Sequence, residues 1–452
     1  MKLNSLTLQN FRCFEHLELD LHPQLTVLIA ENGGGKTAVL EAVCVVISPF
    51  FQGLNLDRKF KIFYIENSDT RLSLQVNKNM EQQFPCIVKA NGCLFQDSIE
   101  NIEWWREYVV PTFQKNILKG DIQKVQEYIQ SLKLLIDEDT NVANLPLIRC
   151  LGTGRVWRGG ISTSVAKEKT FNYDEFSRLS GYSDCLSSEV NFSEFASWFG
   201  WVNRSYREEQ MDAQEEGVPL SEDGKRFLII IKVIQGAVDS VTKETTGWHS
   251  LQYRSSQNKQ LVMRHDENGF IPVEMLSDGI RNTIAMVADI AYRACKLNPH
   301  LGENAAKETD GVVLIDEVDM FLHPKWQQTI LKSLTDAFPK MQFIVTTHSP
   351  QVLSTVRREN IRILPEGKMP EFSPLAHESG DALAKIMNTP KQPPIELMDT
   401  VRAFEQLVRA GKEETEEAKK LRQTLDEKGY QIHESDLTTW RFLAKRKAQK
   451  GA

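Results

Sequence analysis

The stretch of sequence that decides the fold is Ala30-Glu31-Asn32-Gly33-Gly34-Gly35-Lys36-Thr37. It follows the apolar run Leu25–Ile29 and precedes the helical pattern Ala38–Val43, so the order is strand, glycine-rich turn and helix. Three consecutive glycines let backbone N–H groups turn inward at low steric cost, and a helix N-terminus adds the positive end of its dipole. The stretch therefore predicts a loop that cradles the phosphates of a nucleoside triphosphate.

Individual residues of this loop suit different parts of a nucleotide. Lys36 is expected to hold the β- and γ-phosphates as a point charge, and the Thr37 hydroxyl is expected to bind Mg²⁺. Asn32 and the glycines Gly33, Gly34 and Gly35 are expected to line the phosphates. The pattern G-x-x-x-x-G-K-[ST] is met except at its first position, which is Ala30. An ordinary strand-to-helix turn is the alternative, and three further segments argue against it.

Two acids follow a second apolar strand pattern. Val312–Ile315 is a short β-branched run that ends in Asp316-Glu317. A buried strand that ends in two carboxylates is costly unless a cation or a partner meets them. In a phosphate-loop fold, Asp316 is expected to hold hydrated Mg²⁺, and Glu317 is expected to polarise the water that attacks the γ-phosphate.

The other two segments are a helix start and a strand tip. Ser277 and Asp278 suit a helix N-cap, but capping leaves Gly279 in the first turn unexplained, since glycine weakens a helix. A close backbone approach to a ligand accounts for it better. The strand pattern Phe343–Thr347 carries His348 at its tip, and open α/β sheets bind ligands at such ends. We therefore expect His348 to sense the γ-phosphate; the alternative is a surface or core histidine.

The N-terminal region predicts two short strands, because Leu6 and Leu8, and then Leu17 and Leu19, alternate with polar residues. Arg12 lies in the connection between them. It could reach the ribose or the phosphates of a nucleotide, or it could be a solvated loop arginine. The sequence leaves both possibilities open.

Composition places the chain among ordinary globular proteins. Of its 452 residues, 41% are hydrophobic and 25% are charged, and the net charge is −7, so any nucleic-acid binding would need a local patch. The seven cysteines are scattered, and none are spaced C-x-x-C, which is typical of reduced cytosolic thiols; zinc ligation by Cys86 and Cys93 is the alternative. No apolar stretch reaches the ~18 residues that span a bilayer, and Met1 leads directly into a strand pattern. A cytoplasmic protein is expected.

The chain is expected to be an α/β protein with a C-terminal helical segment. Residues 1–50 and 245–390 are predicted to form a head of two lobes, with a mixed sheet and flanking helices. Residues 51–244 are predicted to be a compact, mostly helical insert, parts of which belong to the head. Residues 391–452 follow a proline-rich break and are predicted to be a helical segment that docks a partner.

Three helices are predicted in this last segment, at residues 396–410, 413–428 and 436–449. The third is basic at its end, and no acid follows Asp436. Such an end often only complements the helix dipole and aids solubility, and contact with nucleic acid or a partner is the functional alternative. Its basic residues are Arg441, Lys445, Arg446, Lys447 and Lys450.

Together these segments resemble the ATP-binding-cassette-type ATPases related to the structural-maintenance-of-chromosomes (SMC) proteins, RecF and the OLD proteins. The order of the segments is the order in that family. The matching segments are Asn10-Phe11-Arg12, Gly35-Lys36-Thr37, Leu276-Ser277-Asp278-Gly279, Asp316-Glu317, Leu322-His323-Pro324 and Thr347-His348-Ser349-Pro350.

This resemblance implies an ATPase that uses Mg²⁺ and whose heads dimerise head to tail. Ser277 and Gly279 of one subunit would close over the ATP held by the other, Asp319 would face the dimer interface, and His348 would be the switch histidine. The glutamine loop of the family has no clear counterpart in the sequence. Ala30 departs from the glycine that is usual in the family.

Within that group, the chain resembles the PtuA-type ATPases of Septu and retron antiphage systems. That likeness implies a homodimer or higher homo-oligomer, an HNH nuclease partner similar to PtuB and, in retrons, a reverse transcriptase with its multicopy single-stranded DNA. The segments that carry it are Gly152-Thr153-Gly154-Arg155, Arg178-Leu179-Ser180-Gly181-Tyr182, Ala403-Phe404-Glu405 and Arg441-Phe442-Leu443.

The function implied is a regulatory ATPase that gates a bound nuclease in phage defence. A RecF- or OLD-like ATPase of DNA repair or recombination is the alternative, and a nucleotide-binding scaffold is a third possibility, which Glu317 opposes. The chain is not expected to be a nuclease itself, because its sequence shows no H-N-H-like cluster, no C-x-x-C clip and no toprim-like set of acids.

Overall fold

The computed structural model describes residues 1–54, 62–74, 79–93, 101–109, 116–137, 143–155, 177–188, 192–254, 260–390 and 393–450. Contacts between residues divide the chain into two units, Met1–Ala382 and Leu383–Ala452. The division falls before the predicted boundary at residue 391. It does not separate the predicted insert, residues 51–244, from the rest of the first unit.

The first unit is built on a sheet of five parallel strands. Their order is β15-β3-β14-β13-β9, and every neighbouring pair is parallel. These strands are almost wholly buried, as their continuous apolar runs predict. Because they are parallel, their carboxyl ends lie at one edge of the sheet. The strands are β3 (Leu25–Ile29), β9 (Leu147–Leu151), β13 (Gly311–Ile315), β14 (Met341–Thr346) and β15 (Ile361–Ile363).

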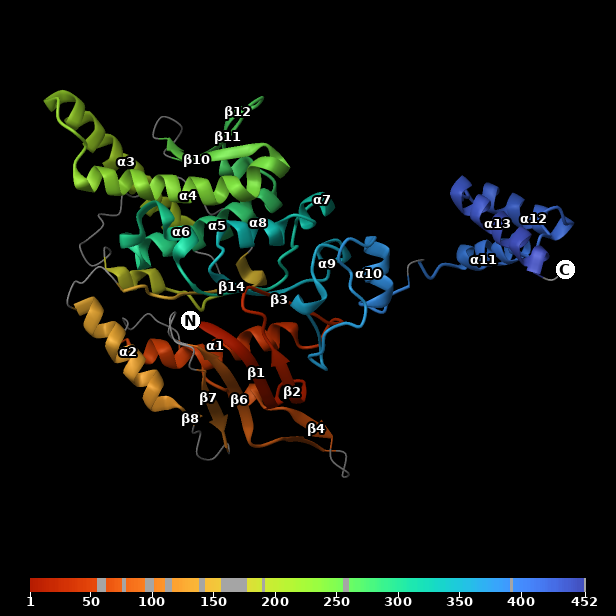
Figure 1. Ribbon diagram of the computed structural model, residues 1–452, viewed down its shortest axis with the longest axis horizontal. Helices are drawn as coiled ribbons and strands as arrows, with labels where there is room; N and C mark the ends of the chain where they lie inside the picture. Colours follow the sequence, from red (N-terminus) through yellow and green to blue (C-terminus); the bar gives the residue numbers. More distant parts are fainter. Residues whose placement is uncertain are drawn as a thin grey trace. The chain divides into compact units, whose positions relative to one another are not determined.

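A second, antiparallel sheet has the order β2-β1-β6-β7-β8. Helix α1 (Lys36–Gly53) lies between the two sheets, since it contacts β14 as well as β6 and β7 (Figure 1). The Trp104 indole N–H donates to the Val46 carbonyl oxygen at 2.7 Å and ties the second sheet to this helix. Its strands are β1 (Lys2–Phe11), β2 (Phe14–Asp20), β6 (Cys86–Cys93), β7 (Ile102–Tyr108) and β8 (Asn116–Gly120).

The expected α/β fold is confirmed, but parallel and antiparallel strands belong to separate sheets. The predicted insert supplies β6, β7 and β8 to one sheet and β9 to the edge of the other. It also contributes the small hairpin β4 (Leu72–Leu74) and β5 (Met80–Gln82). Its helices are α2 (Ile122–Asp137), α3 (Phe192–Glu216) and most of α4 (Glu222–Thr246).

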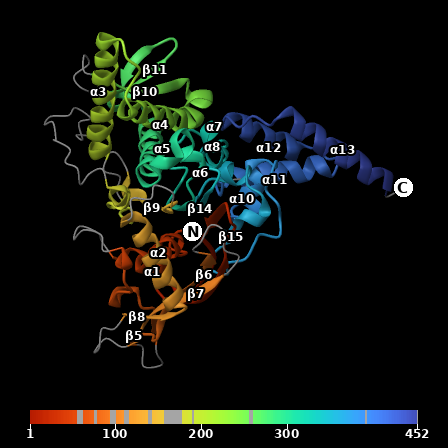
Figure 2. The ribbon, with the colours of Figure 1, turned by 60° about the vertical axis from the view of Figure 1, so that its left-hand side comes forward.

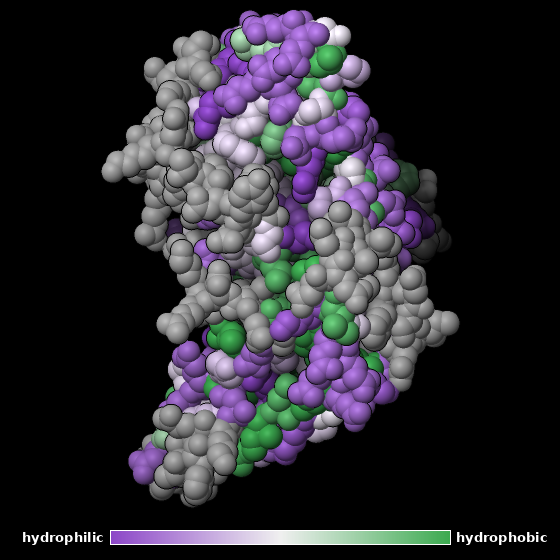
Figure 3. Space-filling view, turned by 90° about the vertical axis from the view of Figure 1, so that its left-hand side faces the viewer, coloured by the Kyte–Doolittle hydropathy of each residue, from purple (hydrophilic) through white to green (hydrophobic). Residues whose placement is uncertain are grey.

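Helices α3 and α4 pack side by side at one end of the first unit (Figures 1 and 2). The N-terminal half of α3 buries Phe192, Phe195 and Phe199, whereas residues 204–216 are mostly exposed. Such a run of charged and polar residues is typical of either a solvated helix or a loop, and here it is helical. Hydrophilic residues dominate the upper part of the face in Figure 3, where α3 lies.

A three-stranded antiparallel sheet, β10 (Trp248–Arg254), β11 (Gln260–His265) and β12 (Gly269–Pro272), precedes helix α5 (Asp278–Leu297). The short 3-10 turn η5 (Val273–Met275) joins β12 to α5. The meander predicted from the sequence is therefore confirmed. Helix α6 (Ala305–Glu308) then leads to β13.

The sequence after Pro324 has apolar residues at helical spacing and predicts one helix that ends near Pro339. That prediction is wrong, because two short helices are present, α7 (Pro324–Gln327) and α8 (Ile330–Ala337). The Thr329 hydroxyl donates to the Trp326 carbonyl oxygen at 3.1 Å. Such a local bond competes with the helical hydrogen-bond ladder and accounts for the break. Helix α9 (Pro350–Leu353) and the 3-10 turn η7 (Arg358–Asn360) complete the approach to β15.

A buried ion cluster joins three parts of the first unit. The Asp289 carboxylate on α5 accepts from Arg149 Nε of β9 at 2.6 Å and from Arg293 Nε at 3.1 Å. The Nη1 groups of Arg149 and Arg293 donate to carbonyl oxygens of residues 181–187. All three side chains are buried. The cluster therefore fixes β9 and the segment 177–188 against α5.

The second unit holds the three helices that the sequence predicts, α11 (Glu396–Arg409), α12 (Glu416–Glu427) and α13 (Glu434–Lys450). Helix α10 (Ser379–Lys385) contains the division between the units. In the described part of the chain, no helix is long and apolar enough to span a bilayer. The core of the second unit is Met398, Val401, Phe404, Val408, Ala418, Leu425, Leu437 and Trp440.

Candidate nucleotide-binding site

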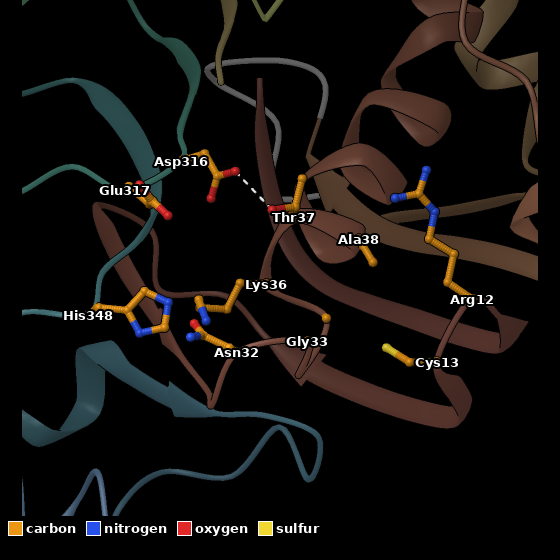
Figure 4. Close-up of a pocket in the computed structure, with 11 residues that line it drawn as sticks. Arg12, Cys13, Asn32, Gly33, Lys36, Thr37, Ala38, Asp316, Glu317 and His348 are labelled. Carbon is orange, nitrogen blue, oxygen red and sulfur yellow. Dashed lines mark hydrogen bonds between the residues drawn. The ribbon is translucent and has the colours of Figure 1, made fainter. Parts of the chain in front are cut away.

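Three neighbouring strands of the parallel sheet bring the predicted site residues together. Strand β3 ends at the glycine-rich loop, β13 ends at Asp316 and Glu317, and β14, which lies between them, leads to His348. These ends surround a cavity of about 400 Å³ (Figure 4). The residues that line it are Arg12, Cys13, Asn32, Gly33, Gly35, Lys36, Thr37, Ala38, Asp316, Glu317 and His348.

The glycine-rich loop needs its glycines for steric reasons. Gly35 has φ +86°, and a Cβ there would lie 2.3 Å from the Phe14 ring. A Cβ on Gly34 would lie 2.6 Å from the Cβ of Ala30. The methyl group of Ala30, which replaces the usual glycine, is thus accommodated because Gly34 has no side chain.

Lys36 follows this loop and folds back over it. Its Nζ donates to the carbonyl oxygens of Ala30 at 3.0 Å and of Glu31 at 3.2 Å. Burial lowers the pKa of Lys36, and the nearby Asp316 and Glu317 carboxylates partly oppose that shift. In Figure 4 its side chain lies beside Asn32 and His348.

A chain of hydroxyls and carboxylates connects the loop to the next strands. The Thr37 hydroxyl donates to Asp316 Oδ2 at 2.9 Å, and the Thr346 hydroxyl donates to Asp316 Oδ1 at 2.6 Å. The Glu317 N–H in turn donates to the Thr346 hydroxyl at 2.7 Å. Thr346 therefore positions both Asp316 and Glu317. The sequence analysis did not predict this role. A hydroxyl residue at the end of a buried strand could have indicated it.

The donor set fits a magnesium ion. Two adjacent ligands of an octahedral Mg²⁺, each ~2.0–2.1 Å from the metal, are themselves about 2.9 Å apart. The Thr37 Oγ1 and Asp316 Oδ2 atoms have that separation. A hydroxyl and a carboxylate are also the oxygen ligands that this ion accepts beside phosphates and water. The neighbouring residue Glu317 has φ +48°, a conformation that non-glycine residues seldom adopt.

Hydrogen bonds on both sides of His348 hold its backbone. The Thr347 hydroxyl donates to Asp319 Oδ1 at 2.5 Å and accepts from the Ser349 N–H at 3.0 Å. The Ser349 hydroxyl donates to Gln327 Oε1 at 2.8 Å. The half-buried His348 is thus fixed at the edge of the cavity. Asp319 therefore lies beside the end of β14. Gln327 lies there too, and the sequence analysis did not predict its position.

Arg12 lies at the other end of the cavity, and its guanidinium is directed away from Lys36 (Figure 4). It pairs with Glu41 of α1 and, at 2.9 Å, with Asp69. Burial lowers the pKa of Arg12, but these two carboxylates outweigh that effect and the pKa is raised. Arg12 is therefore an ion-paired residue of the cavity lining and not a freely solvated loop arginine. Glu41 and Asp69 were not foreseen.

The predicted site residues at the start of helix α5 lie outside the cavity. Ser277 occupies the N-cap position but makes no capping hydrogen bond through its side chain, and it is exposed. A Cβ on Gly279 would lie 2.4 Å from the Phe321 carbonyl oxygen. The close approach predicted for Gly279 is thus to the backbone of this chain, because α5 packs on the loop that follows β13. Neither Ser277 nor Gly279 is among the described residues that line the cavity.

Comparisons with known families agree with this site. The family described as "AAA domain" matches residues 5–218. A second AAA-domain family, whose description adds the AbiEii toxin and a Type IV TA system, matches residues 188–354. Both matched regions include residues around the cavity. The two matches together span the glycine-rich loop, the two acids after β13 and His348.

Several curated proteins are similar in sequence. The Retron Vc95 probable ATPase of Vibrio cholerae is 25% identical, over 94% of this chain and 87% of that protein. The Retron Ec83 probable ATPase of Escherichia coli is 26% identical, over 94% of this chain and 84% of that protein. The Septu protein PtuA of Bacillus mycoides is 38% identical, but over only 22% of this chain and 13% of that protein.

One solved structure, of an SMC head bound to the C-winged helix domain of ScpA, covers 80% of this chain and 94% of that chain, at 11% identity and a TM-score of 0.46. That score is too low to support an argument. The fold assignment rests on the sheet topology and on the AAA-domain matches. The resemblance expected from the sequence is confirmed as a similarity: two AAA-domain families match parts of the α/β unit, and the chain is similar to the probable ATPases of retrons and to Septu PtuA.

Proposed function

We propose that the chain binds and hydrolyses ATP as the regulatory subunit of an antiphage defence complex of the Septu or retron type. In this proposal, ATP-dependent dimerisation of its heads gates an associated HNH nuclease. The observation that carries the ATPase part is the convergence of Lys36, Thr37, Asp316, Glu317 and His348 on one cavity. The similarity to two retron ATPases over nearly the whole chain supports the defence part.

The site residues have distinct roles in this proposal. The loop residues from Asn32 to Gly35 cradle the phosphates through their N–H groups, and Lys36 leaves its carbonyl partners to bind phosphate oxygens. Thr37 and Asp316 hold Mg²⁺, which neutralises charge on the phosphates. Glu317 orients and polarises the attacking water, and His348 contacts the γ-phosphate. Arg12 contacts the ribose or the phosphates of the nucleotide from the far end of the cavity.

The exposed start of α5 suits a site shared between two subunits. Ser277 is exposed and lies outside the cavity of its own chain, as expected if it closes over the ATP of a neighbour. Asp319 accepts a hydrogen bond from the Thr347 hydroxyl. It lies in the same loop as Phe321, whose carbonyl oxygen packs against Gly279. This contact would link each ATP site to the start of α5 in the same chain.

A mixing experiment tests the shared site. Ser277→Arg should leave ATP binding to a single head intact but abolish dimerisation and turnover, because a long cation replaces the small hydroxyl. Lys36→Ala should fail in ATP binding. When the two inactive variants are mixed, the heterodimer should regain one of its two sites, which is measured as ATP turnover against protein ratio. If confirmed heterodimers show no recovery, the site is not shared.

The second unit is the proposed dock for the nuclease. Deletion of residues 436–452 is a poor test, because Leu437 and Trp440 belong to the core of this unit. Exposed residues of α13 offer a better one: Phe442 is 61% exposed, and Lys445 is also exposed. A large apolar side chain beside cations suits a partner surface.

The double variant Phe442→Asp/Lys445→Glu is therefore expected to reduce co-purification of the nuclease at least tenfold, as removal of an interface anchor does. ATP turnover and the melting temperature should be unchanged. Lys419→Glu, on exposed α12, is the matched control and should keep the nuclease bound. Full retention of the nuclease by the double variant would place the dock elsewhere.

A RecF- or OLD-like ATPase of DNA repair is the second candidate. The OLD nuclease of Thermus scotoductus is 24% identical over 80% of this chain and 62% of that protein. Purification from the native operon separates the candidates: an HNH nuclease in the complex, with or without a reverse transcriptase and its single-stranded DNA, supports the defence role. If the purified chain alone cuts DNA or RNA, and loses this activity when its own residues are changed, the assignment of cleavage to a partner is wrong.

A further inference from the structure

The outer face of the sheet β10–β12 carries a stack of three side chains that the nucleotide site does not use. The guanidinium carbon of Arg254 lies 3.5 Å from the centroid of the Phe270 ring, and that of Arg264 lies 6.0 Å from it. On the opposite face, Tyr253, Leu261 and Met263 are buried. We call Arg254, Phe270 and Arg264 the arginine platform.

The strand register explains how this platform is built. Arg264 pairs with Phe270, whereas Arg254 pairs with Gln260 near the other end of β11. Arg254 must therefore extend diagonally across β11 to reach the Phe270 ring. Val262 lies between these positions, on the same face, and is fully buried. The long arginine thus covers the middle of the sheet and holds its planar guanidinium flat against an aromatic ring.

The described carboxylates do not neutralise the charge of the platform. No ion pair joins Arg254 to another described residue, and the nearest carboxylate oxygen to Arg264 is that of Asp266 at 4.0 Å, where both side chains are more than half exposed. The antiparallel sheet of the same unit offers a contrast. There, Lys89 lies 5.9 Å from the Trp105 ring, but its Nζ is 2.9 Å from Glu103. A cation beside an aromatic ring on this protein can thus have a close carboxylate partner, whereas among the described residues Arg254 has no ion pair and Arg264 has only Asp266 at 4.0 Å.

We propose that the arginine platform binds single-stranded nucleic acid. Unpaired bases stack on aromatic rings and on guanidinium planes, and arginines beside them attract the phosphates. A flat sheet face with two arginines and one phenylalanine presents both kinds of contact. A duplex keeps its bases inside the helix, so it could use only the charges. Because the net charge is −7, contact with a polyanion requires a local basic patch, and the arginine platform is such a patch.

The test measures binding of the full chain, without ATP, to a labelled single strand of about 20 nucleotides, since a single binding fold covers ~4–16 nucleotides. DNA and RNA strands are both used, with fluorescence anisotropy as the readout. Arg254→Ala/Arg264→Ala should weaken binding about tenfold or more, and the slope of log affinity against log salt should become shallower by about 0.7 for each phosphate that the variant no longer neutralises. Phe270→Leu should weaken binding about tenfold, because the bases have no ring on which to stack.

Three controls decide what these decreases in affinity mean. Lys89→Ala removes a cation that already has a carboxylate partner, and it should leave the affinity unchanged. Arg264→Ala alone removes an exposed side chain and should weaken binding without changing the melting temperature. The third control is Lys445→Ala/Arg446→Ala on α13, which should have less effect than the platform variants.

Four outcomes would overturn the proposal. They are no binding by the unaltered chain, equal binding of duplex and single strand, full affinity in folded platform variants, or a decrease in affinity confined to the α13 variant. Because no ATP is present, none of these results depends on the proposed ATPase activity.

Discussion

Glu317→Gln is expected to lower the rate of ATP hydrolysis about 10²–10⁴-fold, as removal of a general base does, while ATP binding persists. Glutamine has nearly the same shape as glutamate but cannot accept the proton of the attacking water. The Glu317 N–H bond to the Thr346 hydroxyl comes from the backbone, so the variant keeps the hydrogen bond that places this residue. ATP-bound head dimers should accumulate, because they no longer turn over.

Two comparisons make this prediction specific. Lys36→Ala should weaken ATP binding itself, since Lys36 Nζ supplies the positive charge in the loop. Glu371→Gln is the matched control: it removes a carboxylate from an exposed residue outside the glycine-rich loop and the cavity lining and should leave turnover unchanged. Phosphate release and equilibrium binding of ATP are measured on each variant. Undiminished hydrolysis in Glu317→Gln would remove the assignment of Glu317.

Asp289→Asn is expected to lower the free energy of unfolding of the first unit by about 3–5 kcal/mol, the usual cost of breaking a buried ion pair. Asp289 is 5% exposed and binds two arginines, which are 1% and 6% exposed. The variant leaves both cations without an anion inside the protein. Asp336→Asn is the matched control, because its pair with Lys332 is exposed to solvent and should contribute little to stability. Denaturant titration measures both.

The effect of Asp289 should depend on pH. Burial raises the pKa of Asp289, but Arg149 and Arg293 lower it more, so the pKa in the folded chain is below its ordinary value. A depressed carboxyl pKa stabilises the fold above the unfolded value of about 3.9, and this contribution is lost as the pH falls through the folded value. The stability difference between the unaltered chain and Asp289→Asn should therefore be constant near neutral pH and shrink in acid. A difference that grows in acid would contradict this account.

Local patterns in the sequence were sufficient to predict the elements of the nucleotide site. The run Leu25–Ile29, the three glycines and the helix after them follow from steric and periodic rules that act within a few residues. The acids after Ile315 and the histidine after Thr347 could be located in the same way, because the apolar run of a buried strand stops where the strand ends. The order of these segments also indicated a likeness to ATPases, and the chain is indeed similar to an AAA-domain family and to a retron probable ATPase.

Only the tertiary structure decided which strands are neighbours and which polar groups meet. The sequence carries no register, so it could not show that β14 lies between β3 and β13, or that Thr346 joins Asp316 to the Glu317 backbone. It also could not show that Gly279 packs closely against the Phe321 carbonyl oxygen, whereas the predicted approach of Gly279 to a ligand stays a prediction. Asp289 binds Arg149, which lies 140 residues away along the chain. Arg254 contacts the Phe270 ring, which belongs to another strand. Such contacts depend on how the elements pack, and a local pattern carries no information about packing partners.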